Sequence, residues 1–169
     1  YSQEHNLQVH IHLCETQKEV KDCVKKYGKK PVPFLNELGF LHANVIAAHC
    51  VWLDDKDLAL LSKNDVKISY DPVSNMKLAV GNVMPYPKMV KQGLKIGLGT
   101  DGTASNNNLD MFQTMKFASL LQKLRYDSST VLPAHDVFTM ATKIGANILG
   151  WQYGIAEGKL ADVVLVDLK

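Results

Sequence analysis

The sequence predicts an α/β protein in which short parallel strands alternate with helices. Four apolar segments are rich in β-branched residues and end abruptly, and a helix-like stretch follows each of them. The expected strands cover residues 7–13, 44–50, 66–71 and 94–101. Repeated strand-then-helix units are typical of parallel strands joined by right-handed crossovers.

The helices are indicated by their end signals. Thr16 is expected to cap the first, with Glu19 completing a capping box and Gly28 ending the helix. A short helix is expected over 32–38, a third opening at Asp54 or Asp55, and another over 85–92. Asn108 is expected to open a long amphipathic helix, and Pro133 a final helix that Gly150 ends.

Composition excludes several classes of protein. The chain is 46% hydrophobic with a net charge of +2, and its basic residues are too few and scattered for a nucleic-acid surface. Three cysteines without CxxC spacing argue against a disulfide scaffold, and no glycine-rich nucleotide-binding motif follows a strand. No membrane span or signal peptide is visible, so we expect a soluble, cytoplasmic protein.

Polar residues stand where the expected strands end. His10 and His12 share one face of the first strand, and Glu15 follows it. His49 and Asp101 stand at the ends of the second and fourth strands. Taken alone, His49 fits a buried core residue and Asp101 fits a helix cap. Together, these imidazole and carboxylate groups suit a divalent ion, most often zinc, with iron an alternative.

Four stretches carry a family resemblance: "HIHLCET", "AAHCVWLDD", "DPVSNMKLAVG" and "GLGTDGTASNNNLDMF". In order and spacing they resemble the amidohydrolase superfamily, closest to its 5′-methylthioadenosine/S-adenosylhomocysteine deaminases in the chlorohydrolase-like group. That family folds as a (β/α)8 barrel with a small β-sandwich. The resemblance implies a zinc-dependent hydrolytic deamination of adenine nucleosides.

The resemblance also implies a role for each site residue. His12 and Asp101 would be metal ligands closing strands five and eight, with Asp101 also taking a proton from water. Glu15 would protonate the purine ring, and His49 would hydrogen-bond the attacking hydroxide or the substrate. Ser105 would contact the base.

The first four strands of that barrel, with their own HxH ligand pair, have no counterpart here. Residues 1–150 are therefore expected to form the C-terminal half of the barrel, strands five to eight, and 151–169 the start of the sandwich, with a strand in "ADVVLVDLK". The metal site would be incomplete and the isolated chain inactive. Its open edges would bind a second copy or the missing half.

Two other functions fit the sequence. One is a sister amidohydrolase acting on triazines or guanine, or a chlorohydrolase, because the residues that discriminate these substrates lie outside this chain. The other is a non-catalytic, self-associating subdomain. A cytidine-deaminase-type zinc enzyme is disfavoured because the chain has no PCxxC motif.

Overall fold

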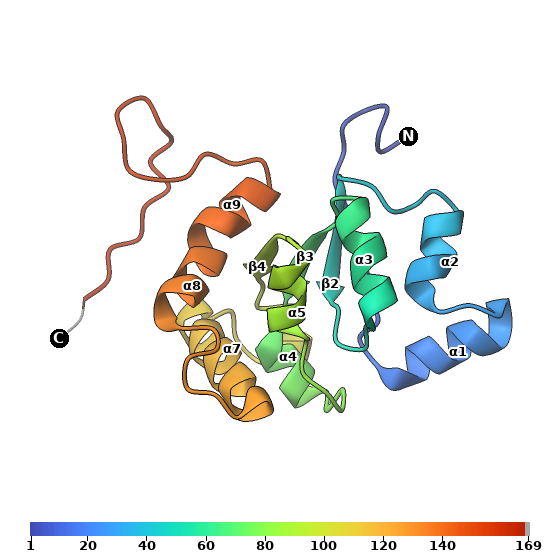
Figure 1. Cartoon of the computed structure of the whole chain (residues 1–169). Helices are drawn as coiled ribbons and strands as arrows, with labels where there is room; N and C mark the ends of the chain where they lie inside the picture. Colours follow the sequence, from blue (N-terminus) through green and yellow to red (C-terminus); the bar gives the residue numbers. More distant parts are fainter. Residues whose placement is uncertain (168–169) are drawn as a thin grey trace.

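A four-stranded parallel sheet forms the centre of the computed structural model, which describes residues 1–167 (Figure 1). Its strands are β1 (Val9–Leu13), β2 (Val45–His49), β3 (Lys67–Tyr70) and β4 (Ile96–Leu98), and they lie in sequence order. Each strand pairs in parallel with the next. The predicted α/β class with parallel strands is confirmed, and every strand is shorter than expected.

Helices occupy the connections between the strands, with α1 to α3 at one end of the molecule and α7 to α9 at the other (Figure 1). Their bounds are α1 (Gln17–Tyr27), α2 (Pro31–Glu37), α3 (Asp55–Lys63), α4 (Pro72–Lys77), α5 (Tyr86–Lys91), α6 (Thr103–Asn106), α7 (Met111–Tyr126), α8 (Ala134–Thr139), the π-helical turn η1 (Met140–Ile144) and α9 (Gly145–Ile148). Sequence reasoning missed α4 and α6, and it began α7 too early, since its cap is Asp110 rather than Asn108.

The start of α1 departs from the expected capping box. Thr16 caps the helix as predicted, accepting the Glu19 N–H at 3.1 Å. Glu19 reaches past the cap, and its carboxylate accepts the backbone N–H groups of Cys14 at 2.7 Å and Glu15 at 2.8 Å. This side chain therefore holds the turn between β1 and α1 in place of closing a box.

The two faces of the sheet differ in character. Ala47, Ile68 and Ile96 form one row across β2, β3 and β4, and they belong to the aliphatic core under the helices. The next row on the opposite face joins His12, Ala48, Ser69 and Gly97. Alternation along a strand sends neighbouring side chains to opposite faces, so the first row stabilises the fold and the second leaves polar groups free for a site.

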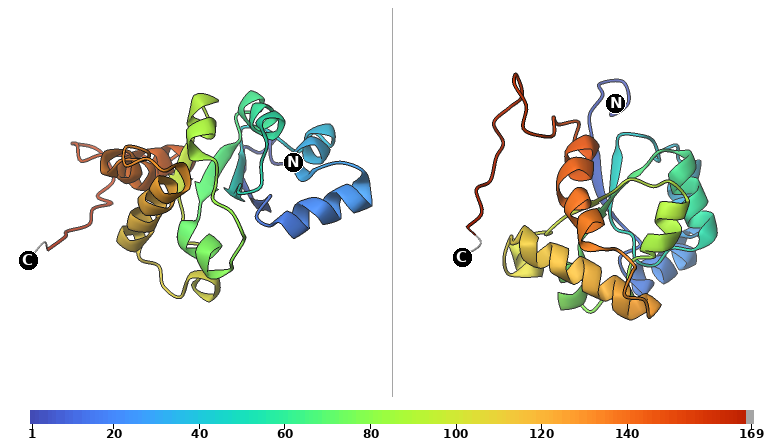
Figure 2. Two further views of the ribbon diagram at one scale, coloured as in Figure 1. Left: turned by 60° about the horizontal axis from the view of Figure 1, so that its bottom comes forward. Right: turned by 60° about the vertical axis from the view of Figure 1, so that its left-hand side comes forward.

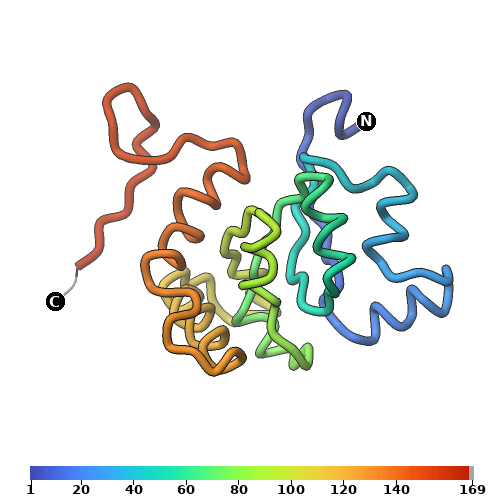
Figure 3. Tube along the Cα trace, viewed as in Figure 1, coloured from blue at the N-terminus to red at the C-terminus, as the bar shows by residue number. Residues whose placement is uncertain are grey.

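The chain after α9 leaves the body of the molecule, as both views in Figure 2 and the trace in Figure 3 show. Residues 160–167 form no strand, and Leu165 is fully exposed. The strand expected there is wrong for these residues, because a strand needs a neighbour to take its backbone hydrogen bonds. The rest of that segment, 168–169, lies outside the described residues. Within 1–167, no helix is long and apolar enough to cross a membrane.

Candidate active site

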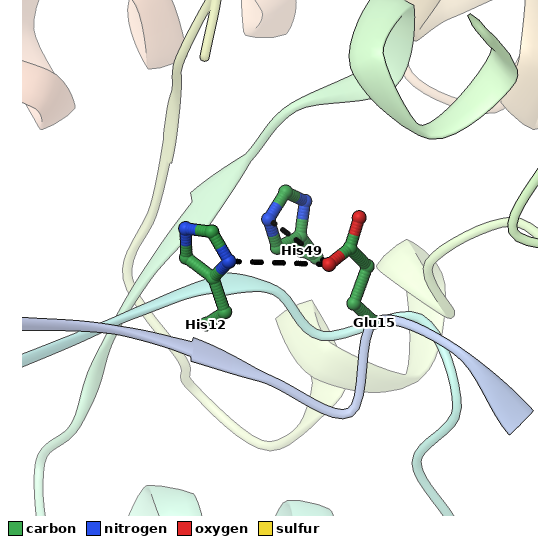
Figure 4. Close-up of side chains that lie close together, drawn as sticks. All are labelled: His12, Glu15 and His49. Atoms are coloured by element: carbon green, nitrogen blue, oxygen red, sulfur yellow. Dashed lines mark ion pairs between the residues drawn. The ribbon is translucent and has the colours of Figure 1, made fainter. Parts of the chain in front are cut away.

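Three predicted site residues meet at the carboxyl edge of the sheet, as Figure 4 shows. The Glu15 carboxylate oxygen Oε2 lies 3.9 Å from Nδ1 of His12 and 3.8 Å from Nε2 of His49. The two imidazole rings meet edge to face, with their centroids 4.9 Å apart. One nitrogen or oxygen from each of the three residues lies within 4.8 Å of the others. These separations are too long for direct hydrogen bonds and leave room for an ion or a water molecule between the groups.

Backbone conformation turns these side chains toward one another. His49 ends β2 with φ at 69°, and Cys14 directly follows β1 with φ at 52°. Both lie in the left-handed region that side chains other than glycine rarely adopt. His49 is aligned with the core residue Leu13, and its left-handed backbone instead sends the ring toward Glu15. Such strain persists only where surrounding contacts fix the backbone.

His49 is 1% exposed and is held by two residues from the β3–α4 region. Its ring nitrogen Nδ1 lies 2.9 Å from Oδ1 of Asn75 and 3.7 Å from Oδ2 of Asp71. The same Asp71 oxygen accepts the backbone N–H of His49 at 3.3 Å. The other ring nitrogen, Nε2, is buried without a hydrogen-bond partner among the described residues.

Asp71 is a buried carboxyl group beside this histidine. Burial raises its pKa to about 6, although His49 and the Ser69 hydroxyl, 3.1 Å away, pull the pKa downward. Gly99 of the neighbouring segment leaves space for it, since a Cβ there would stand 2.6 Å from Ser69 Oγ and closer still to Asp71 Oδ1. The glycine is therefore required by this close approach.

Asp101 lies three residues beyond the end of β4, rather than at the strand tip that the sequence predicted. Its Oδ2 accepts hydroxyl hydrogens from Ser74 at 2.6 Å and Ser105 at 2.7 Å, and its Oδ1 accepts the Gly102 N–H at 2.7 Å. Burial alone would raise the pKa of Asp101, but these three hydrogen bonds outweigh it and lower the pKa to about 2. The group is therefore ready to act as a carboxylate.

The residues fit a divalent metal. Two ligands about 2.1 Å from a tetrahedral zinc ion lie about 3.4 Å apart, and the Glu15–histidine separations are only slightly longer. Nε2 of His49 has no hydrogen-bond partner among the described residues, and the ring of His12 is exposed, with 69% of its side chain accessible. Each ring can ligate an ion through a nitrogen that carries no proton. Asp101 is not among the three clustered residues, and its role as a ligand stays a prediction.

Sequence reasoning found the residues that ended strands and missed those that support them. Ser74 and Asn75 lie in α4, a helix that the sequence analysis does not predict. A signal was present, because Asp71 before Pro72 is the pattern of a helix start with proline at its first position. Ser105, predicted to contact a base, bonds to the Asp101 carboxylate in this structure.

Comparisons with known proteins agree with this geometry. The sequence model of the amidohydrolase family matches residues 1–169. The chain is 52% identical over 97% of its length to a 5′-deoxyadenosine deaminase of Methanothermobacter thermautotrophicus, and 54% identical over 93% to a 5-methylthioadenosine/S-adenosylhomocysteine deaminase of Thermococcus sibiricus. It covers 38% and 37% of those two proteins.

Among solved structures, a zinc-bound adenosine deaminase from Xanthomonas campestris superposes with a TM-score of 0.84. It is 35% identical in sequence, and the match covers 89% of this chain and 34% of that one. The chain thus spans well under half the length of the relatives it matches.

Proposed function

Because this chain belongs to the amidohydrolase family, we propose that it forms part of a metal-dependent deaminase of adenine nucleosides with modified 5′ positions. The observation that carries the proposal is the meeting of His12, Glu15 and His49 at the carboxyl edge of parallel strands. In barrels built from such strands, this edge is where catalytic side chains gather. We take the chain as strands five to eight of the barrel, with 151–169 opening the sandwich.

The reaction replaces the exocyclic amine of the purine with a carbonyl oxygen from water and releases ammonia. A bound divalent ion would lower the pKa of water toward neutrality, and His12 with Asp101 would hold that ion. Asp101 is suited to accept the proton of the attacking water, because its three hydrogen bonds keep it ionised.

Glu15 would donate a proton to a ring nitrogen of the purine, and Asp101 would return its proton to the departing amine. Glu15 would regain a proton from the added hydroxyl group as that group becomes the carbonyl oxygen of the product. The buried Nε2 of His49 would form a hydrogen bond with the attacking oxygen or the substrate, because it has no hydrogen-bond partner within residues 1–167. Ser105 would order Asp101 and border the base. Positioned side chains that donate and accept protons are what such a reaction requires.

The decisive test is ammonia release by the complete protein that contains this sequence, loaded with zinc. We expect deamination of 5′-deoxyadenosine, methylthioadenosine or S-adenosylhomocysteine, and loss of at least a hundredfold in kcat for Glu15→Gln. Activity on guanine or a chlorotriazine with none on adenine nucleosides would overturn the assignment. The 169-residue chain assayed alone should be inactive and bind zinc poorly.

We also propose that the chain associates with a second copy or with the rest of its barrel. Apolar side chains support this, since Val163, Val164 and Leu165 of the C-terminal segment are at least 63% exposed. β1 also offers an unpaired edge within the described sheet. Gel filtration with light scattering should show a species larger than one chain, and a stable monomer that binds no apolar dye would contradict the proposal.

A further inference from the structure

The ring of His49 is held asymmetrically. On one side, Nδ1 faces two oxygen atoms, the amide Oδ1 of Asn75 at 2.9 Å and the carboxylate Oδ2 of Asp71 at 3.7 Å. On the other side, Nε2 has no hydrogen-bond partner among the described residues and faces Glu15 Oε2 at 3.8 Å. A neutral imidazole carries one proton, and the bond made by one nitrogen decides what the other can do.

We propose that Asn75 is a positioning residue that, with Asp71, holds His49 in the tautomer with its proton on Nδ1. A carboxylate oxygen only accepts hydrogen bonds, so the negative Asp71 favours a proton on the nitrogen it faces. That proton is then donated to Asn75 Oδ1. The lone pair of Nε2 is left pointing at the space between Glu15 and His12.

Asn75 is itself fixed well enough for this role. It is 5% exposed, and its backbone N–H donates to the Asp71 carbonyl at 3.0 Å in the first turn of α4. Pro72 at the start of that helix fixes the direction of the chain. The start of α4 therefore places Oδ2 of Asp71 and Oδ1 of Asn75 beside the same nitrogen, Nδ1 of His49.

The remaining polar atom of Asn75 also suits this orientation. Its Nδ2 has no hydrogen-bond partner in the described part of the chain, and Asn75 lines a cavity of about 140 Å³ that Tyr70 and Val80 also border. A space of this size has room for water, which accepts hydrogen bonds from an amide N–H. With the amide reversed, two donors would face each other whenever Nδ1 carried a proton.

The consequence concerns what His49 offers to the proposed active site. With the proton on Nδ1, Nε2 is an acceptor or a metal ligand, in the arrangement where an oxygen acceptor orients a ligating imidazole. With the proton on Nε2, the ring would be a donor and could not bind an ion. The meaning for catalysis rests on the proposed function, whereas the tautomer itself is a property of this chain.

The test is a long-range proton–nitrogen correlation spectrum of the histidine rings in the 15N-labelled chain. It is recorded at a pH high enough that the ring shifts no longer change, because only neutral rings have tautomers. The chain has six histidines, and the signals of His49 are those missing from a His49→Gln spectrum. We expect the pattern of a protonated Nδ1 and an unprotonated Nε2. A protonated Nε2 in the unmodified chain overturns the proposal whatever the enzyme's substrate.

Variants separate positioning from general loss of structure. Asn75→Leu should shift the ratio of the two tautomers by roughly fivefold or more toward Nε2–H, since it removes one buried hydrogen bond. Asn75→Asp keeps an oxygen acceptor and should retain Nδ1–H. Asn106→Ala is the matched control, because Asn106 is equally buried, with 4% exposure, and bonds to the Thr100 carbonyl away from His49. An unchanged ratio in Asn75→Leu, or an equal shift in Asn106→Ala, contradicts the role of Asn75.

Discussion

Gly99→Ala is the sharpest test of how the site is packed. A Cβ at this position would stand 2.6 Å from Ser69 Oγ and closer still to Asp71 Oδ1, so the Asp71 side chain must move. Moving it breaks the hydrogen bonds from Ser69 Oγ at 3.1 Å and from the His49 N–H at 3.3 Å. Overpacking costs about 1–3 kcal/mol, and each lost hydrogen bond about 1 kcal/mol. We expect the free energy of unfolding to fall by roughly 3 kcal/mol.

Urea denaturation followed by circular dichroism measures this loss. Gly102→Ala is the matched control, since a Cβ there meets nothing within 4 Å and its φ of −70° suits any residue. The control should change the free energy of unfolding by less than about 0.5 kcal/mol. If Gly99→Ala is as mild as Gly102→Ala, Asp71 is not held where the structure places it, and the support for His49 fails with it.

Three further predictions concern the carboxylates near the site. Ser74→Ala removes the 2.6 Å hydrogen bond to Asp101 and should cost about 1–2 kcal/mol in urea denaturation, with most of that cost absent in an Asp101→Asn background. Glu19→Ala removes the acceptor of two backbone N–H groups, one of them that of Glu15, and should lower the free energy of unfolding by about 2–3 kcal/mol. The control Asp22→Ala, which breaks an exposed ion pair with Lys18, should lower it by less than about 0.5 kcal/mol. The depressed pKa of Asp101 contributes stability that is complete above about pH 4 and is lost as the pH falls through about 2. The difference in free energy of unfolding between the unmodified chain and Asp101→Asn should therefore become smaller on acidification. A difference that stays constant with pH would contradict the lowered pKa of Asp101.

The sequence predicts the sheet well because the signals for strands are local. Apolar β-branched runs and helix end signals identified all four strands, and Thr16 caps its helix as expected. It predicts His12, Glu15 and His49 as neighbours because parallel strands bring their carboxyl ends to one edge. The supports of His49 are different, since Asn75 is 26 residues away and its contact depends on how α4 packs. No local pattern encodes such a contact.

The left-handed backbone at the strand ends is the other feature that the sequence pattern does not predict. Alternation along β2 places His49 with Leu13 on the core side, and only a φ of 69° redirects its ring. Strand propensity predicts the extended conformation up to that residue and contains no sign of the reversal. The Asp71 carboxylate favours the left-handed conformation of His49, because in that conformation it accepts the backbone N–H of His49.

Several unfavourable features of the molecule lie close together at this edge of the sheet, and their proximity is an argument for function. Left-handed residues such as Cys14 and His49 cost on the order of 1–3 kcal/mol each, against a total stability of about 5–15 kcal/mol for an ordinary domain. Asp71 adds a buried carboxyl group whose pKa is raised by desolvation and by the nearby charge of Asp101. The opposite face of the same sheet packs into the hydrophobic core, and the burial of apolar side chains there offsets these costs. A chain selected for stability alone would not keep strain, a buried acid and an imidazole nitrogen without a hydrogen-bond partner among the described residues within one cluster, so their coincidence supports the active site proposed at this edge.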